Sequence, residues 1–219
     1  MLKILVTGFE PFGGESVNPS SLAAEQAARV LSEKLGTSVV HAILPVSFKR
    51  TREVVRELVA KVEPDIAVGL GLSGGIAHVA VERVALNFID ARSPDNDGVT
   101  IYDEPIEPDG PLAYLSTLPV KLIVKRLREL GIPAAVSYSA GTFLCNLVFY
   151  ELLHLRALTG VPKKAGFLHI PYLPSQAVSK RSWSGYAPSM PLEYVVKAVA
   201  TAVETTVERM ELGDEKIPL

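Results

Sequence analysis

Cys145 is the only cysteine in the chain and the first candidate for chemistry. Residues 140–146 lead into residues 147–154, whose composition is that of a helix, so Cys145 is expected in the first turn of this helix. Unpaired backbone N–H groups and the positive end of the helix dipole favour a thiolate at such a place, and the thiolate is the form that attacks carbonyl carbons. A free cysteine is also among the residues most often simply buried, so its type alone leaves a core position open.

A thiolate nucleophile needs a base within hydrogen-bond reach, and the chain has four histidines that could supply it. His154 follows Cys145 by nine residues, and at about 100° for each residue one helix would turn the two side chains to opposite faces. His41 lies in an apolar segment, where a histidine packed in the core is the default. His169 ends an apolar segment that meets a loop, and catalytic groups commonly emerge at such strand ends.

Glu82 is the carboxylate whose surroundings require a partner. It lies between Val81 and Arg83 in an otherwise apolar segment, where an unpaired ionised side chain is costly. A neighbouring pair with Arg83, or a place on an exposed edge strand, would compensate the charge, and so would a hydrogen bond to a catalytic imidazole. If the segment is a strand, His78 lies on the same face as Glu82 and is a second candidate for the base.

Two glycine-rich segments have the spacing of nucleotide-binding motifs but lack their context. Residues 69–74 read Gly-Leu-Gly-Leu-Ser-Gly, yet the β-branched residues that follow predict a strand where a dinucleotide site needs a helix. Residues 8–14 have the spacing of a phosphate loop, but Gly14 stands where the lysine is required. Phe9 and Phe12 in this second segment are either satellite core residues or the walls of a small apolar pocket. A nucleotide-binding or non-catalytic module is therefore the alternative from another function class.

The elements that must position these residues alternate along the chain, which predicts an α/β fold with a mostly parallel sheet covered by helices. Residues 87–119 are rich in proline, aspartate and asparagine and predict a long loop that serves as a lid, a binding loop or an oligomer contact. The expected strands cover residues 2–7, 39–44, 65–70, 77–85, 134–138 and 166–170. The expected helices run from Ser20 or Ser21 to Leu35, around residues 58–62, over residues 123–130, and from near Pro191 towards Met210.

The composition is that of a self-folding chain with a sizeable core, because 48% of its 219 residues are hydrophobic and 21% are charged. We expect one domain over residues 1–219, with a mobile tail after about residue 213. The net charge of −2 gives no electrostatic reason to bind nucleic acid or an anionic membrane. A lone cysteine and the absence of a signal-like start favour the cytoplasm. The longest uncharged run, residues 66–81, is interrupted by glycines and falls short of the roughly 18 residues that a spanning helix needs.

Several separated motifs, in the right order, resemble the pyroglutamyl-peptidase I (pyrrolidone-carboxylate peptidase) family of cysteine peptidases over nearly the whole chain. This resemblance implies a three-layer α/β/α sandwich with an open, mostly parallel twisted sheet, and a homo-oligomer, commonly a tetramer. The motifs that carry it are residues 6–14 with Asn18-Pro19, residues 82–87, residues 90–96, residues 140–146, residues 169–174 and residues 188–190.

The same resemblance implies the reaction and the residues that perform it. Cys145 is expected to be the nucleophile, His169 the general base and acid, and Glu82 the carboxylate that orients the imidazole. The implied reaction is hydrolysis of the N-terminal pyroglutamyl (5-oxoprolyl) residue of peptides through a thioester acyl-enzyme, with no metal and no cofactor.

The substrate is a small, flat, neutral ring, which needs apolar walls and a few hydrogen bonds. By resemblance to the family, Phe9, Phe12 and Phe143 line this ring, and Leu72 and Arg92 are also expected among the substrate-binding residues. Arg92, in an Asp-Ala-Arg motif, is a candidate for stabilising the oxyanion, as are backbone N–H groups around the nucleophile.

Two positions depart from the family pattern. Ile76 stands where the family commonly has arginine, and Ser93 stands where it commonly has an apolar residue. Loss of an arginine removes up to five hydrogen-bond donors, so the network around Glu82 or a subunit contact is expected to differ. A related peptidase with altered specificity is therefore a third hypothesis.

Overall fold

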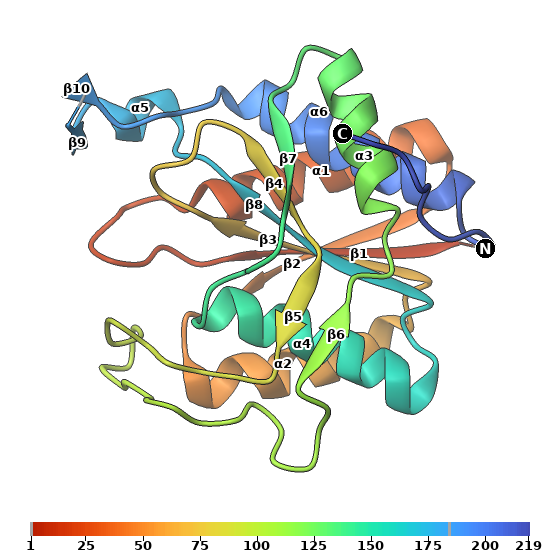
Figure 1. The fold of residues 1–219 in the computed structure, drawn as a ribbon, viewed down its shortest axis with the longest axis horizontal. Helices are drawn as coiled ribbons and strands as arrows, with labels where there is room; N and C mark the ends of the chain where they lie inside the picture. Colours follow the sequence, from red (N-terminus) through yellow and green to blue (C-terminus); the bar gives the residue numbers. More distant parts are fainter. Residues whose placement is uncertain (1, 184) are drawn as a thin grey trace.

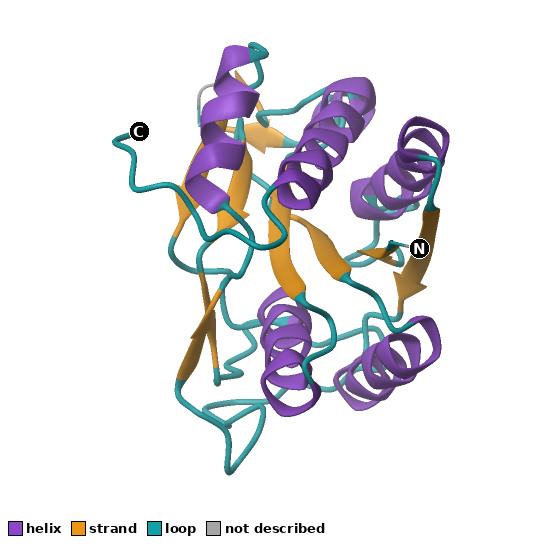
Figure 2. Cartoon of the chain, turned by 90° about the vertical axis from the view of Figure 1, so that its right-hand side faces the viewer, coloured by secondary structure: helices purple, strands orange, loops and turns teal. Residues whose placement is uncertain are grey.

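In residues 2–183 and 185–219, which the computed structural model describes, six strands form a central sheet between two layers of helices (Figure 1, Figure 2). The strand order is β2-β1-β3-β8-β4-β7, and every neighbouring pair is parallel except β4 and β8. The predicted α/β/α sandwich with a mostly parallel sheet is confirmed. The strands are β1 (Lys3–Phe9), β2 (Ser38–Leu44), β3 (Ile66–Leu72), β4 (Val79–Glu82), β7 (Ala134–Ser137) and β8 (Lys164–Ile170).

The helices divide between the two faces of the sheet, as Figure 2 shows end-on. One face carries α1 (Pro19–Leu35), α3 (Val120–Glu129) and α6 (Leu192–Glu208), and the other carries α2 (Phe48–Val62) and α4 (Leu144–Thr159). Each layer has its own hydrophobic core. A short helix, α5 (Pro174–Ala177), follows β8 outside these layers.

Side chains that point to alternate faces of the central strands contribute to both hydrophobic cores. Ile4 and Val6 of β1 pack in the core beneath α1, while Leu5 between them packs in the core beneath α4. Successive side chains of a strand point to opposite faces, so a strand buried on both sides reads as a continuous apolar run. In β8 the same alternation places Phe167 in the core beneath α4 and puts His169 on that face too.

The helix α1 begins and ends at recognisable caps. The Asn18 side chain accepts a hydrogen bond from the Ser20 N–H, and Pro19 occupies the first position, where its missing N–H costs nothing. The helix ends at Leu35 as predicted, because Gly36 adopts the left-handed conformation with φ of 58°. The predicted cap at Ser20 or Ser21 is two or three residues late, because Asn18 takes the capping position.

The expected single strand over residues 77–85 is wrong. The chain leaves the main sheet after Glu82, and β5 (Val84–Leu86) pairs with β6 (Ala113–Leu115) in a separate antiparallel ribbon. Arg83 is the crossing point, since its N–H donates to the Ser137 carbonyl at 2.7 Å and its carbonyl accepts from the Ser116 N–H at 2.9 Å. Glu82 is therefore the last residue of β4.

The long segment over residues 87–119 is folded against the body of the protein. Its two arms meet at an antiparallel bridge between Ile89 and Glu104. At its tip, Asp95 accepts from the Phe48 N–H at the start of α2, at 2.7 Å. The Asn96 amide donates to Glu10 Oε1, at 2.9 Å, in the loop that follows β1. The segment thus supports the loops at the carboxyl ends of the strands.

The C-terminal part of the chain adds a hairpin and a tail. The hairpin β9 (Arg181–Ser182) and β10 (Gly185–Tyr186) projects from the body beside α5 (Figure 1). In the tail, the Asp214 carboxylate accepts from the Lys121 N–H at the start of α3. Tail mobility stays a prediction. No helix within the described ranges is long and apolar enough to span a membrane.

Candidate active site

Cys145 is the second residue of α4, and its side chain is half-buried. The chain turns at Gly141, whose φ is 76°, and enters the helix through Phe143 in an extended conformation. Phe143 provides no side-chain cap, so the first backbone N–H groups of α4 are not used by a capping side chain. This leaves the nucleophile candidate beside free donors at the positive end of the helix dipole.

The sulfur of Cys145 rests against the backbone of β3. A Cβ atom on Gly71 would lie 2.6 Å from Sγ and 3.0 Å from Cζ of Phe167, so only glycine leaves room here. A Cβ atom on Gly69 would lie 2.5 Å from Cδ2 of Phe167. Close approach of side chains therefore explains these two glycines. After β3 the chain continues through a turn into β4 and forms no helix, which removes the context that a dinucleotide site needs.

His169 lies beside Glu82 because of how β8 pairs with its neighbours. In the sheet register His169 is opposite Gly71 of β3 on one side and Ala80 of β4 on the other. Its Nδ1 lies 2.8 Å from Glu82 Oε1, and both side chains are buried. Gly71, His169 and Glu82 thus follow one another across the three adjacent strands β3, β8 and β4, and the Cys145 side chain of α4 packs against the first of them.

The other partners considered for Glu82 lie elsewhere. Arg83 pairs with Asp214, with 3.0 Å between Nη1 and Oδ2. His78 precedes β4, in the turn after β3, and has no part in the pair with Glu82. His41 is exposed on β2, contrary to the expectation of a core histidine, because β2 is an edge strand.

The surroundings of His169 hold its imidazole in the charged form. Burial by itself lowers the pKa, but the charge and hydrogen bond of Cys145 and the hydrogen bond to Glu82 outweigh it and raise the pKa of His169 to about 10. A cationic imidazole between a sulfur and a carboxylate is a group that can give a proton to a leaving amine. The second carboxylate oxygen, Glu82 Oε2, is buried without a hydrogen-bond partner among the described residues.

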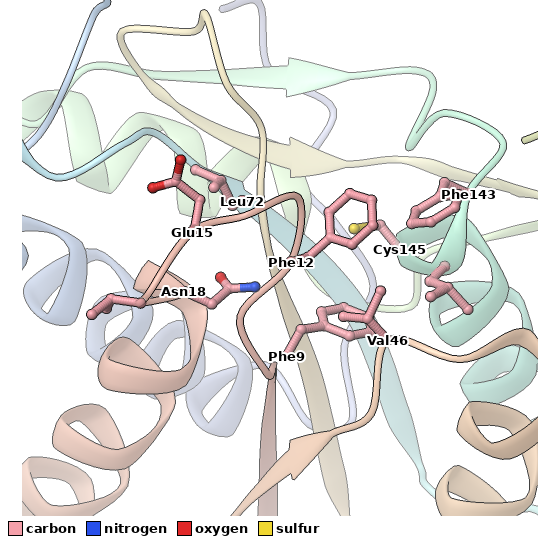
Figure 3. Close-up of a pocket in the computed structure, with 10 residues that line it drawn as sticks. Phe9, Phe12, Glu15, Asn18, Val46, Leu72, Phe143 and Cys145 are labelled. Carbon is pink, nitrogen blue, oxygen red and sulfur yellow. The ribbon is translucent and has the colours of Figure 1, made fainter. Parts of the chain in front are cut away.

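Next to Cys145 lies a small apolar cavity of about 130 Å³. Figure 3 shows the rings of Phe9, Phe12 and Phe143 around the sulfur. The Phe12 and Phe143 rings lie 5.3 Å apart between centroids. Cavities that take drug-sized ligands measure roughly 300–1,000 Å³, so this one has room for a single small ring only. Its lining residues are Phe9, Phe12, Glu15, Val17, Asn18, Val46, Leu72, Phe143, Leu144 and Cys145.

Five of these were not expected from the sequence: Glu15, Val17, Asn18, Val46 and Leu144. Glu15 forms an ion pair with Lys180 and accepts from Gln176 at 2.9 Å, and these hydrogen bonds lower the pKa of the Glu15 carboxyl. The amide of Asn18 is engaged in capping α1. The polar groups at this cavity are thus already paired within the protein. The sequence could have indicated Asn18, because it stands directly before Pro19 in a helix-capping position and shortly after Phe9 and Phe12.

The structure does not bring Arg92 into this cavity. Its side chain is exposed, and Arg92 lies outside the set of lining residues. The loop that carries it is tied to the loop that precedes Cys145, since the Asp90 N–H donates to the Thr142 carbonyl at 3.0 Å. Ser93 beside it is also exposed. Within residues 2–183 and 185–219, no cluster of three or more histidine, cysteine or acidic side chains is arranged to hold a metal ion.

Comparison with known proteins gives consistent matches over the chain. A sequence model of the pyroglutamyl peptidase family matches residues 2–209. The chain is 48% identical to pyrrolidone-carboxylate peptidase of Thermococcus litoralis, over 100% of both chains. It is 46% identical to the pyrrolidone-carboxylate peptidase of Pyrococcus furiosus, over 95% of this chain and 100% of that one.

Solved structures agree with the sequence matches. The structure of the pyrrolidone carboxyl peptidase from Thermococcus litoralis superposes with a TM-score of 0.92 at 46% identity and covers 100% of both chains. A mutant pyrrolidone carboxyl peptidase from Pyrococcus furiosus gives a TM-score of 0.91 at 46% identity, with 95% of this chain and 100% of that chain covered.

Proposed function

The chain belongs to the pyroglutamyl peptidase family, and we propose that Cys145, His169 and Glu82 are the catalytic triad of this cysteine peptidase. As a member of the family it removes N-terminal pyroglutamate from peptides. One observation carries the assignment of the triad. The sulfur of Cys145 packs against Gly71 and lines the ring-sized cavity. It is a side-chain hydrogen-bond partner of the buried His169 imidazole, which is hydrogen-bonded in turn to the buried Glu82 carboxylate.

In the first half of the reaction, the Cys145 thiolate attacks the carbonyl carbon of the pyroglutamyl residue. A C–S bond forms while the carbonyl π electrons move onto the oxygen. The unpaired N–H groups at the start of α4 are the donors that hold this oxyanion. When the carbonyl re-forms, the C–N bond breaks and its electron pair takes the proton of His169. The peptide leaves with a free amino group, and the pyroglutamyl group stays on sulfur as a thioester.

In the second half, His169 acts as a base. Its now neutral imidazole takes a proton from a water molecule as the water oxygen attacks the thioester carbon. The C–S bond then breaks, the electron pair returns to sulfur, and pyroglutamate is released. Glu82 accepts the Nδ1–H of His169 throughout, which keeps the other ring nitrogen turned towards the reacting atoms.

The cavity selects a neutral ring by excluding charge. Phe9, Phe12, Leu72 and Phe143 provide apolar walls for the ring. An ordinary peptide would bring a charged terminal ammonium into this cavity, where nothing is free to pair with it, because Glu15 is already engaged. A pyroglutamyl residue carries a lactam in place of that ammonium. Arg92 is not one of the proposed substrate-binding residues, because its side chain is exposed and does not line the cavity.

Three variants test this assignment. Cys145→Ala should abolish release of a chromogenic amine from a pyroglutamyl substrate. His169→Ala should lower kcat by about 10² to 10⁴, the contribution of positioned proton transfer, and Glu82→Gln should cost less. Mass spectrometry of enzyme quenched during turnover should find the pyroglutamyl group on Cys145. If Cys145→Ala still releases the amine, the nucleophile is assigned wrongly.

The protein is further proposed to act as a homotetramer in the cytoplasm. Large apolar side chains on the projecting hairpin support assembly, since Trp183 is 99% exposed and Tyr186 is 57% exposed. A reducing compartment suits an enzyme whose sulfur must stay free. Sedimentation equilibrium should give four times the 23.6 kDa of one chain. A monomer at micromolar concentration would contradict the assembly.

A further inference from the structure

A second cavity, of about 370 Å³, adjoins the proposed catalytic imidazole and shares no lining residue with the ring-sized cavity. Its lining includes His169 and Glu82 themselves, together with Ile76, His78, Ser137 and Ser139. The first cavity is bounded by residues at the ends of β1 and β3 and includes Cys145 but not His169. The second is bounded by β4, by the end of β7 and by the turn after β3.

The order of the two cavities follows the order of groups in the substrate. A ring held in the first cavity presents its carbonyl at Cys145. The next atom is the scissile nitrogen, which must lie within hydrogen-bond reach of His169 to receive its proton. Chain beyond that nitrogen then continues past His169. We propose that the second cavity binds the residue that follows pyroglutamate, an inference that rests on the catalytic assignment above.

The lining of the second cavity predicts which residues it accepts there. The Ser139 hydroxyl, which accepts from the Gly141 N–H at 3.3 Å, still has its own proton to donate to a peptide carbonyl of any sequence. Among the lining residues the ionisable groups are His78, Glu82 and His169, with no lysine or arginine. Glu82 already pairs with His169, so no cationic side chain in the lining is left to pair with an acidic residue. The cavity therefore favours basic or neutral residues and disfavours an acidic residue or a free carboxylate.

Charge substitution at His78 tests this preference. The wild type should cleave pyroglutamyl-lysine amide with a kcat/KM roughly 3- to 10-fold above that for pyroglutamyl-glutamate amide, the range of a single charge interaction near a protein surface. His78→Glu should widen this ratio, and His78→Lys should narrow or reverse it. His41→Glu is the matched control, since His41 is an exposed histidine on the edge strand β2, and it should leave the ratio unchanged. A ratio unaffected by both His78 variants overturns the assignment.

Bulk substitution provides a second, independent measurement. Ser139 is exposed, so Ser139→Trp should fold and fill part of the cavity. For this variant, KM for a pyroglutamyl tripeptide amide should rise at least roughly tenfold more than KM for pyroglutamamide, whose leaving group is only ammonia. Excluding one well-packed substrate residue from the cavity costs about 1.4 kcal/mol or more of binding free energy, which is a factor of about ten. Ser38→Trp, at an exposed serine that begins β2, is the control for a surface tryptophan.

The two assays separate failure of this inference from failure of the proposed function. If the wild type cleaves neither the amides nor pyroglutamamide, the peptidase assignment itself is wrong. If the wild type cleaves them all, and Ser139→Trp raises both KM values equally, the peptidase stands and the second cavity is not its leaving-group site.

Discussion

At the residue scale, the position of the nucleophile depends on the missing side chain of Gly71. Its backbone forms the surface against which the Cys145 sulfur packs, and a methyl group there would approach Sγ to 2.6 Å. Real carbon–sulfur contacts are much longer than this, so either the thiol or the strand must move. Because reacting atoms must be aligned closely, a displacement of about 1 Å can cost on the order of 10²-fold in rate.

Gly71→Ala should therefore lower kcat by roughly 10²-fold while the protein remains folded. Steady-state kinetics of the variant and the wild type give the change in kcat. Circular dichroism and thermal unfolding check that the variant is folded. Gly213→Ala is the matched control, since a Cβ atom there meets nothing within 4 Å and its backbone is not left-handed. Normal turnover by Gly71→Ala would show that the thiol does not need this packing.

The sequence predicted the three catalytic candidates but could not choose between His78 and His169 without help from the family resemblance. Both precede or end an apolar segment, and both lie near Glu82 under some pairing of strands. The choice depends on the antiparallel pairing of β4 with β8, which sets Ala80 opposite His169. Strand order and register are long-range properties, and one sequence does not display them.

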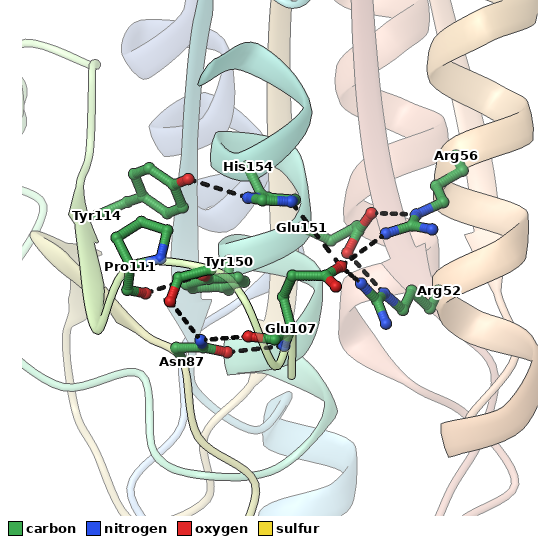
Figure 4. Close-up of polar contacts among 10 residues, drawn as sticks. Arg52, Arg56, Asn87, Glu107, Pro111, Tyr114, Tyr150, Glu151 and His154 are labelled. Carbon is green, nitrogen blue, oxygen red and sulfur yellow. Dashed lines mark hydrogen bonds and ion pairs between the residues drawn. The ribbon is translucent and has the colours of Figure 1, made fainter. Parts of the chain in front are cut away.

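At the scale of elements, an ion network around one buried carboxylate ties the two helices of one layer to the long loop (Figure 4). Glu151 of α4 is fully buried and pairs with both Arg52 and Arg56 of α2. Glu107 of the loop pairs with the same two arginines. His154, which the helix turns away from Cys145, lies here with its Nδ1 2.9 Å from the Tyr114 hydroxyl. The network anchors the base of the loop to α2 and α4.

Glu151→Gln should destabilise the fold because it leaves two arginines without their buried anion. Breaking a fully buried pair costs about 3–5 kcal/mol, and the partial exposure of Arg52 and Arg56 lowers the expected loss to about 2–3 kcal/mol. Urea unfolding of the variant and the wild type measures this loss of unfolding free energy. The control is Glu63→Gln, which removes the exposed pair with Lys3 and should cost less than about 1 kcal/mol. Equal losses in the two variants would show that the network contributes little.

The tip of the same loop supports the ring-sized cavity. The Asn96 amide donates to the Pro11 carbonyl at 3.0 Å and to Glu10 Oε1 at 2.9 Å. These contacts fix the backbone next to Phe12, one wall of the cavity. The sequence predicted a long loop here, as a lid, a binding loop or an oligomer contact. It could not show which segment the loop would contact, because the contact joins segments far apart in the chain.

Asn96→Ala should raise KM for pyroglutamyl substrates by roughly 2- to 10-fold, since each lost hydrogen bond is worth about 0.5–1.5 kcal/mol. The effect on kcat should be smaller, because the triad is untouched. Ser93→Ala changes an exposed residue of the same loop and should leave KM as in the wild type. A change in kcat without a change in KM would place Asn96 in a different role.

At the scale of the whole molecule, the site forms where the strand order reverses. β2 lies on one side of β1, and β3 lies on the other. Open α/β sheets bind ligands in the crevice that such a reversal leaves at the carboxyl ends of the strands. Phe9 at the end of β1 and Leu72 at the end of β3 line the ring-sized cavity there. The alternation of apolar runs predicted a mostly parallel sheet covered by helices, whereas the place of the reversal could be found only from the strand order.

Charge at this crevice links the active site to the stability of the whole fold. The pKa of His169 is raised from an ordinary value of 6.5 to about 10 in the folded protein, so the folded state holds this proton more tightly than the unfolded state does. A group of this kind stabilises the fold fully below pH 6.5 and loses that contribution as the pH rises through about 10. The free energy of unfolding that depends on His169 should therefore decrease across this window.

His169→Gln should remove that dependence. Urea unfolding of the wild type and the variant at pH 7 and pH 10 gives two differences in the free energy of unfolding, and the wild type should lose more stability between these pH values than the variant does. The loss of unfolding free energy for Cys145→Ala should lie between those of the wild type and His169→Gln, because Cys145 supplies part of the proton affinity of His169. His41→Gln, at an exposed histidine, should follow the wild type. Parallel pH profiles for wild type and His169→Gln would mean that the imidazole is not held as a cation, and proton donation to the leaving amine would then need another source.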